Sequence, residues 1–371
     1  MAPQELASLH VDTEVGWGGG QQQVLYLLEG LRRRGLRAEL AARPRSVVGK
    51  RAAAAGASVH ELPLRGEWDL TSALRIAGML RRGRFGILHL HTAHAHALGR
   101  IASIVRRPPA VVVSRRVVFP IRGTVRRWFK YLRGVDKYIA VSSGVAGCLA
   151  RAGVREERIA IVPSGVDPAR FQNAPRADLR SELGLPPDVQ LVGMVGQLTC
   201  GKGQEDLVSA APAVVQKHPD TVFLLVGEGE NRRTLEKLAA ELGIADRVVL
   251  TGFRSDVPSV LAGLDVFVMP SHAEGFCNSV IEAMMAGLPV VGTNISGIAS
   301  IVEDRRTGLL VPKGNAVGLA EAICKLLTDK DLRKEMGEKG RRRALDNFTV
   351  DNMVQKTIQI YEELGRVGHE E

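Results

Sequence analysis

Several features are missing from this chain of 371 residues, and each absence narrows what the protein can be. No apolar run approaches the roughly 20 residues of a transmembrane helix. Residues 1–20 lack the basic stretch and following apolar stretch of a secretory signal peptide, so none is expected. The cysteines lie far apart and form no C-x-x-C pair: Cys148, Cys200, Cys277 and Cys324. This spacing argues against disulfides or a zinc site and favours the reducing cytoplasm.

Acidic residues are scarce in the first part of the chain. Residues 1–165 hold 27 Lys and Arg against 11 Asp and Glu, a formal charge of +16, whereas residues 166–371 hold 23 against 29, or −6. A preference for Arg codons would explain why Arg is used in place of Lys, but not why the two parts of the chain differ in charge. The first part is therefore expected to meet an anionic partner: a membrane surface, a phosphorylated acceptor or a nucleic acid.

Short runs of Val, Ile and Leu alternate with helical patterns along the chain, which predicts parallel sheets with right-handed crossovers. The expected strands are 6–11, 38–42, 59–62, 87–91, 110–114, 138–141, 159–162, 191–195, 222–226, 248–250, 266–269, 289–292 and 309–311. The clearest helical patterns are 21–34, 71–82, 204–217, 231–242 and 316–327. Four prolines in 168–187 predict a boundary there, with one domain over 1–168 and a second over 169–348.

The segment 271–291 carries the most chemical information. It reads as the end of a strand, a loop containing Gly275, and a helix, with Glu274 before the loop and Glu282 inside the helix. Such a loop directs backbone N–H groups and a helix N-terminus at an anion. The two carboxylates can accept hydrogen bonds from hydroxyls on either side of that anion. A phosphate between two polyhydroxylated rings is a nucleotide sugar.

The order of these motifs closely resembles glycosyltransferase family 4, the retaining enzymes of the GT-B fold, of the lipopolysaccharide and cell-envelope type. The resemblance rests on the Glu-x7-Glu segment and on shorter motifs spread over nearly the whole chain: 18–21, 34–35, 141–143, 162–167, 196–198, 202–203, 226–229, 251–253 and 307–312. It implies an α/β architecture of two Rossmann-like, doubly wound parallel-sheet domains facing a cleft. It also implies that a last helix, 349–371, packs back on the first domain.

The resemblance further implies roles for individual residues. Glu274 would contact the donor sugar, Glu282 the nucleotide ribose, and Lys202 the donor diphosphate as charge develops on it. The catalytic set would be Glu274, Lys202 and His91, with His91, Arg115 and Arg116 on the acceptor side. Donor contacts would come from Gly18, Gly19, Gln197, Lys202, Gly252, Phe253, Arg254, Glu274, Gly275, Phe276, Cys277, Asn278 and Glu282.

The chain departs from the family pattern in two places. Gln197 stands where many relatives have an Arg beside the diphosphate, and Arg254 is a candidate substitute. The strand over 110–114 continues into Arg115 and Arg116, where some relatives have a His. This second departure favours a negatively charged acceptor.

Three other interpretations compete for the same residues. Ser279 to Glu282 fits a helix-capping box, and Glu274 with Glu282 could be a glycosidase carboxylate pair. Residues 196–203 match the start of an NTPase phosphate loop, but Gly203 stands where magnesium needs Ser or Thr.

Four histidines, His89, His91, His94 and His96, follow one another closely. They raise the alternative of a zinc site, but no Cys or acidic cluster accompanies them and the family needs no metal. We therefore expect no metal and no cofactor, with the nucleotide sugar acting as a substrate.

Basic and aromatic residues interleave in 115–133. On a helix, one stripe is basic, and the expected contacts with an anionic membrane are Arg122, Arg126, Trp128, Lys130 and Arg133. The alternatives are a solvated basic face and nucleic acid, although no nucleic-acid-binding module accompanies the segment.

The sequence thus predicts a retaining transferase that moves a sugar from a UDP- or GDP-linked donor to a hydroxyl of a lipid-linked or lipopolysaccharide acceptor. It would work in the cytoplasm, peripheral on the inner face of the cytoplasmic membrane. Two other classes stay open: a GT-B sugar-nucleotide epimerase, and a non-enzymatic basic binder of membranes or nucleic acid.

Overall fold

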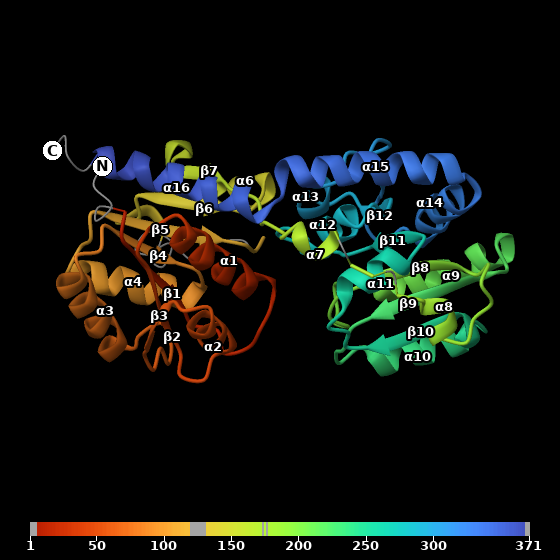
Figure 1. The fold of residues 1–371 in the computed structure, drawn as a ribbon, viewed down its shortest axis with the longest axis horizontal. Coiled ribbons are helices and arrows are strands. Elements are labelled where there is room, and N and C mark those ends of the chain that lie inside the picture. Colours follow the sequence, from red (N-terminus) through yellow and green to blue (C-terminus); the bar gives the residue numbers. More distant parts are fainter. Residues whose placement is uncertain (1–5, 119–130, 173, 176, 368–371) are drawn as a thin grey trace. The chain divides into compact units, whose positions relative to one another are not determined.

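The computed structural model describes residues 6–118, 131–172, 174–175 and 177–367. The chain divides into two compact units (Figure 1). Unit 1 comprises residues 1–165 and 350–371, and unit 2 comprises residues 166–349. Each unit is a parallel sheet with helices on both faces, so the predicted pair of Rossmann-like domains is confirmed.

Unit 1 contains a seven-stranded parallel sheet in the order β3-β2-β1-β4-β5-β6-β7. Its strands are β1 (Ser8–Asp12), β2 (Ala38–Ala42), β3 (Ser58–Glu61), β4 (Ile87–Leu90), β5 (Ala110–Arg115), β6 (Lys137–Ala140) and β7 (Ile159–Ile161). The central strands are buried on both faces, which explains their continuous runs of apolar residues. The order of the strands reverses between β1 and β4, which places the ligand-binding position of such a sheet at their carboxyl ends.

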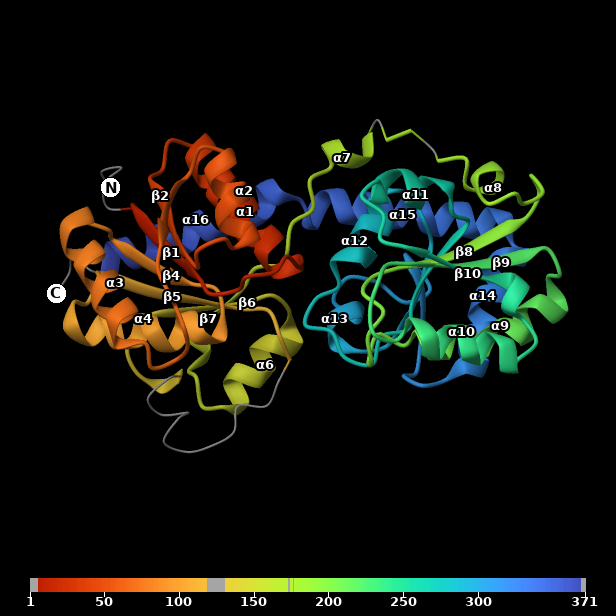
Figure 2. The same ribbon diagram turned by 90° about the horizontal axis from the view of Figure 1, so that it is seen from below.

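Helices cover both faces of this sheet (Figure 2). One face carries α1 (Gly19–Arg33), α2 (Val47–Ala54) and α16 (Val350–Val367), and the other carries α3 (Leu70–Gly83), α4 (Ala93–Val105) and α6 (Ser143–Arg151). The C-terminal helix α16 contributes buried residues to the same core as α1, α2 and β2. A segment from the end of the chain therefore completes the core of the unit that begins it.

Unit 2 has a six-stranded parallel sheet in the order β10-β9-β8-β11-β12-β13. Its strands are β8 (Gln190–Val195), β9 (Thr221–Val226), β10 (Val248–Gly252), β11 (Val266–Met269), β12 (Val290–Thr293) and β13 (Gly308–Val311). The main helices are α9 (Gln204–Lys217), α10 (Arg232–Glu241), α11 (Val257–Gly263), α12 (Asn278–Met285), α14 (Ala316–Thr328) and α15 (Lys330–Asn347). The strand order reverses between β8 and β11, so the carboxyl ends of these two strands mark the position for a ligand.

Shorter elements complete the chain: α7 (Ala169–Gln172), α8 (Leu179–Glu182), α13 (Ser296–Ala299) and the 3₁₀ turns η2 (Glu156–Arg158) and η3 (Ala245–Arg247). Over the helices that the structure describes, none combines the length and the apolar character that a membrane crossing requires.

Candidate active site

The predicted donor residues of unit 2 gather where its strand order reverses. Lys202 lies in the loop after β8, and Glu274 lies in the loop after β11, the neighbouring strand. Their side chains meet: Lys202 Nζ lies 2.6 Å from Glu274 Oε1. The sequence separates these residues widely, but the sheet topology brings them together at the expected ligand position.

The Lys202–Glu274 pair is largely buried, with exposed side-chain fractions of 31% and 11%. Burial opposes the charged form of Lys202, but the Glu274 carboxylate and its hydrogen bond to Lys202 outweigh burial and raise the pKa of Lys202. Lys202 is therefore a fixed cation at neutral pH. The Ser271 hydroxyl also donates to Glu274 Oε1 at 3.1 Å, which leaves the other carboxylate oxygen without a protein partner in the described part of the chain.

Two glycines allow this arrangement. Gly203 has a left-handed backbone (φ 75°), and a Cβ there would lie 2.1 Å from the carbonyl oxygen of Pro270. The residue that rules out an NTPase phosphate loop is thus the one that lets the Lys202 loop approach β11. Gly297 plays a similar part beside Glu274, since a Cβ there would lie 2.3 Å from the Glu274 carbonyl oxygen. No sequence motif marks Gly297.

Helix α12 begins at Asn278, directly after the loop 274–277, and its N-cap residue Cys277 makes no side-chain cap. Burial raises the pKa of the Cys277 thiol to about 12, and Glu274 adds to the shift, so Cys277 stays a neutral thiol. Asn278 Oδ1 is buried and has no hydrogen-bond partner among the described residues. Backbone N–H groups at the start of α12 and this unused acceptor are suited to a polar ligand.

Glu282 lies one turn inside α12 and pairs with Arg170 of α7, with Arg170 Nη1 3.1 Å from Glu282 Oε1. This contact replaces the capping box that the sequence allowed, because Ser279 is inside the helix rather than at its cap. Burial raises the pKa of Glu282, and Arg170 only partly offsets the shift. Arg170 is a site residue that no sequence motif identified.

The remaining predicted donor residues follow β8 and β10, two strands that β9 separates in the sheet. Gln197 follows β8 and is exposed, while Phe253 follows β10 and is 78% exposed. Arg254 pairs with Asp256, with Nη2 2.7 Å from Oδ2, and also with Glu182. These hydrogen bonds, that to Asp256 first, raise the pKa of Arg254. The candidate substitute for the family Arg is therefore already engaged by two carboxylates.

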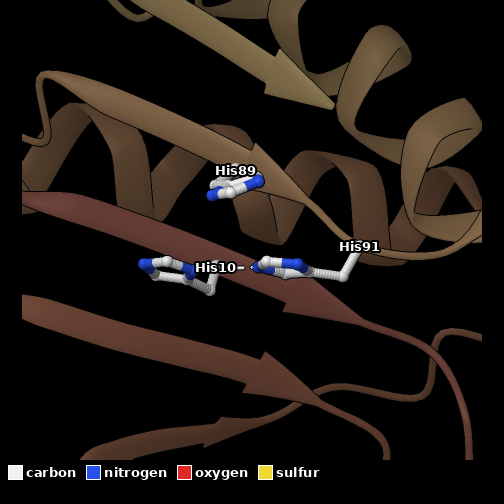
Figure 3. A group of neighbouring side chains, drawn as sticks. All are labelled: His10, His89 and His91. Carbon is white, nitrogen blue, oxygen red and sulfur yellow. Dashed lines mark hydrogen bonds between the residues drawn. The ribbon is translucent and has the colours of Figure 1, made fainter. Parts of the chain in front are cut away.

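In unit 1, three histidines lie on one face of the sheet at its centre (Figure 3). His10 of β1 is the register partner of His89 of β4, and His91 follows two residues later, so all three side chains lie on one face. His10 Nδ1 lies 2.9 Å from His91 Nε2. His94 is exposed on α4 and His96 packs against Tyr131, so the four histidines of 89–96 do not form one cluster. His10, which belongs to the cluster in the structure, was not predicted from the sequence.

The hydrogen bonds of this cluster fix its protonation. Arg116 Nη2 donates to His91 Nδ1 at 3.4 Å, so His91 carries its proton on Nε2 and donates it to His10. His10 in turn donates from Nε2 to Ser8 Oγ at 2.9 Å. His89 binds the Tyr361 hydroxyl with Nδ1 and Ser114 Oγ with Nε2.

These contacts use every ring nitrogen of the three histidines. One nitrogen from each histidine lies within 4.8 Å of the others, as a metal site would require, but each ring nitrogen already faces a protein group. Burial, with a smaller effect of Arg116, lowers the pKa of His10 to about 3. Burial also holds the pKa values of His89 and His91 well below the usual range, so the cluster is neutral at pH 7.

Arg116 links this cluster to the start of α1. Its guanidinium lies near the largely buried carboxylate of Asp12, and a Cβ on Gly20 would lie 3.9 Å from Arg116 Cδ. Burial lowers the pKa of Arg116 to about 10, with Asp12 opposing the shift, so Arg116 stays charged. Gly18 is the N-cap of α1 and makes no side-chain cap. Arg116 and the first turn of α1, which Gly19 begins, are therefore suited to an anionic group.

Arg115, the last residue of β5, donates to the Tyr131 hydroxyl at 2.9 Å. His91 is 6% exposed and both of its nitrogens are occupied. Four of the five expected membrane contacts, Arg122, Arg126, Trp128 and Lys130, lie outside the described residues, and Arg133 is exposed.

Comparisons with known proteins identify the family of the chain. Residues 17–170 match the model of Glycosyltransferase Family 4, and residues 175–343 match that of Glycosyl transferases group 1. The chain is 30% identical to the lipopolysaccharide core biosynthesis glycosyltransferase LpsE of Rhizobium meliloti over 68% of this chain and 69% of that protein. It is 28% identical to the UDP-Gal:alpha-D-GlcNAc-diphosphoundecaprenol alpha-1,3-galactosyltransferase of Escherichia coli, over 79% of each.

Among solved structures, Anabaena Alr3699/HepE in complex with UDP superposes with a TM-score of 0.87 and 22% identity, covering 96% of this chain and all of that one. Such an identity supports the fold alone. The family matches, the relatives and the two parallel-sheet units together show that the chain belongs to the family 4 and group 1 glycosyltransferases and has the GT-B fold.

Proposed function

We propose that this glycosyltransferase uses a nucleotide-sugar donor, UDP- or GDP-linked, and transfers the sugar with retention to a hydroxyl of a lipid-linked or lipopolysaccharide saccharide. The observation that carries the donor part is the buried Lys202–Glu274 pair at the carboxyl ends of β8 and β11. The activities for which two relatives are named support the donor and acceptor classes: one uses UDP-Gal and a diphosphoundecaprenol-linked sugar, and the other acts in lipopolysaccharide core biosynthesis.

The donor would be divided among the residues as follows. Glu274 accepts hydrogen bonds from the sugar hydroxyls with its unused oxygen, while Lys202 and the amides from Gly275 to Asn278 hold the diphosphate. Glu282 accepts from the ribose hydroxyls more strongly in its ionised form, and Arg170 helps to maintain that form. Phe253, exposed beside β10, would cover the base.

The reaction requires little covalent chemistry from the protein. The bond between the anomeric carbon and the diphosphate oxygen breaks, and the acceptor oxygen bonds to the same face of that carbon. The leaving phosphate oxygen takes the acceptor proton. Lys202 stabilises the negative charge that develops on the diphosphate, and the fixed residues hold the reactants in position. No metal ion enters this proposal.

On unit 1, Arg116 is the proposed contact for an anionic acceptor, and the amides of Gly18 and Gly19 would bind a phosphate. Because His91 has no free nitrogen, its proposed part is to orient Arg116. The charge of +16 in residues 1–165 supports a peripheral location on an anionic cytoplasmic leaflet.

The first test is thermal unfolding of the wild type with excess UDP, GDP and ADP. A ligand that binds the folded state at about 100 times its Kd adds about 2.7 kcal/mol and raises the Tm. Glu282→Ala should lose most of the shift. Glu321→Ala, an exposed glutamate on α14, is the matched control and should keep it. If no nucleotide stabilises the wild type, the donor site is wrong.

A second test separates the two glutamates. Glu274→Ala should abolish sugar transfer while retaining more nucleotide affinity than Glu282→Ala does. Equal losses of transfer and affinity in both variants would contradict the proposed division of roles. The anomeric configuration of the product, measured by NMR, tests retention directly.

A further inference from the structure

A pocket lies in unit 1 at the amino ends of its strands, the opposite edge of the sheet from His91 and Arg116. Its volume is about 340 Å³, and its lining includes the residues where β4 and β5 begin, Ile87 and Ala110. The walls come from the end of α3, the connection from α4 to β5, and the end of α16. Buried apolar side chains, Leu80 and Phe85 among them, form its floor.

Four exposed arginines surround this floor: Arg81, Arg84, Arg106 and Arg107. Arg107 Nη2 pairs with Asp136 Oδ1 at 2.7 Å. The other three make no ion pair with any residue that the structure describes. No acidic residue is among the described residues that line the pocket, so its positive charge is largely uncompensated.

Helix dipoles do not account for this clustering. Arg81 lies in the last turn of α3 and offsets the partial negative charge there. Helix α4, however, has no basic residue in its last turn, and Arg106 is already extended (φ −145°) beyond it. Arg84 has a left-handed backbone (φ 48°), a conformation usually left to Gly or Asn. Three positive charges therefore meet at this pocket from two separate segments. One of them, Arg84, has an unfavourable backbone conformation.

We propose that this pocket binds a phosphate-bearing ligand. Guanidinium groups match phosphate oxygens with paired hydrogen bonds, and three or four of them suit a phosphate monoester or diester. The volume falls in the range of about 300–1,000 Å³ typical of small-molecule pockets, and the apolar floor can hold the carbon part of an ester. Ile104 and Val105, 66% and 58% exposed beside Arg106, also allow the phosphate to be a lipid headgroup. The proposal does not depend on the donor chemistry of unit 2.

The test measures saturable stabilisation by sodium phosphate and by sn-glycerol 3-phosphate at constant ionic strength adjusted with potassium chloride. Unfolding is followed by tryptophan fluorescence, because all three tryptophans of the chain lie in residues 1–165. Co-sedimentation with phosphatidylcholine vesicles, with and without phosphatidylglycerol, separates a lipid headgroup from a soluble ester. The variant is Arg81→Ala/Arg106→Ala, and the matched control is Arg341→Ala/Arg342→Ala, two exposed arginines on α15.

We expect the wild type and the α15 control to bind one of these probes, and the pocket variant to bind it more than about tenfold more weakly. Without ligand, the pocket variant should keep the wild-type Tm in the tryptophan fluorescence transition, which shows that unit 1 is folded. Equal binding by the variant and the wild type would overturn the proposal, as would the absence of saturable binding to every probe. Failure of UDP binding alone would count against the donor site and not against this pocket.

Discussion

Acid is expected to destabilise unit 1 through its buried histidines. His10 is neutral in the folded protein because burial, assisted by Arg116, lowers its pKa from 6.5 to about 3. In the unfolded chain His10 binds a proton below about pH 6.5. Between these two pKa values the unfolded state holds the extra proton, so the free energy of unfolding falls as the pH falls.

The expected loss of stability follows from the pH range between the pKa values of His10 in the folded and unfolded states. One pKa unit corresponds to about 1.36 kcal/mol, so moving from about pH 7.5 to about pH 5 should cost about 2 kcal/mol through His10 alone. His89 and His91, whose pKa values are also lowered, add to the loss. Burial raises the pKa of Asp12, so protonation of Asp12 stabilises the folded state as the pH falls. The effect of His10 is therefore measured as the difference in pH dependence between the wild type and a His10 variant.

The assay is urea unfolding followed by tryptophan fluorescence, which reports on unit 1, at the two pH values. His10→Gln removes the titrating group and should lower the stability at both. Between about pH 7.5 and about pH 5, the free energy of unfolding of His10→Gln should nevertheless fall by about 2 kcal/mol less than that of the wild type.

His94→Gln provides the matched control, since His94 is exposed on α4, and its pH dependence should equal that of the wild type. If His10→Gln and the wild type lose the same stability on acidification, then His10 is not held neutral by the fold, and the hydrogen-bond assignment of the cluster fails with it.

Three further predictions concern single contacts. Tyr361→Phe leaves Nδ1 of buried His89 without its partner and should lower the free energy of urea unfolding by about 1–3 kcal/mol, whereas an unchanged value would contradict the contact. Gly203→Ser places a Cβ 2.1 Å from the Pro270 carbonyl oxygen, so the Tm should fall and magnesium-dependent ATPase activity should not appear. Lys202→Met should reduce sugar transfer by about 10²–10³-fold in a coupled assay; a loss of less than tenfold would remove Lys202 from diphosphate stabilisation.

Much of the fold could be predicted because buried parallel strands have a simple signature. The run Val266–Met269 is apolar at every position, and the strand β11 has those bounds. The strand order could not be predicted, because the same runs fit several arrangements of a sheet. Only the order explains why the loop after β8 meets the loop after β11.

The candidate site was predictable where it is local in sequence and not where it depends on packing. Glu274 and Glu282 lie in one segment with a recognisable spacing, and the sheet brings Lys202 to Glu274. Arg170 lies in a separate short helix, and nothing in its neighbourhood marks it as the partner of Glu282. His10 is a single histidine in an apolar strand, and its role depends on register with β4.

The return of the chain to its first unit affects the order in which the protein can fold during synthesis. Unit 2 is continuous, so all of its residues, 166–349, are available before the last helix is made. The core of unit 1 includes Val354, Ile358 and Tyr361 of α16. The first-made unit therefore leaves the ribosome incomplete, and the side of α1 that packs against α16 stays uncovered until α16 emerges. The unit that begins the chain should be the last to reach its native state, and truncation just before Val350 should leave it prone to aggregate.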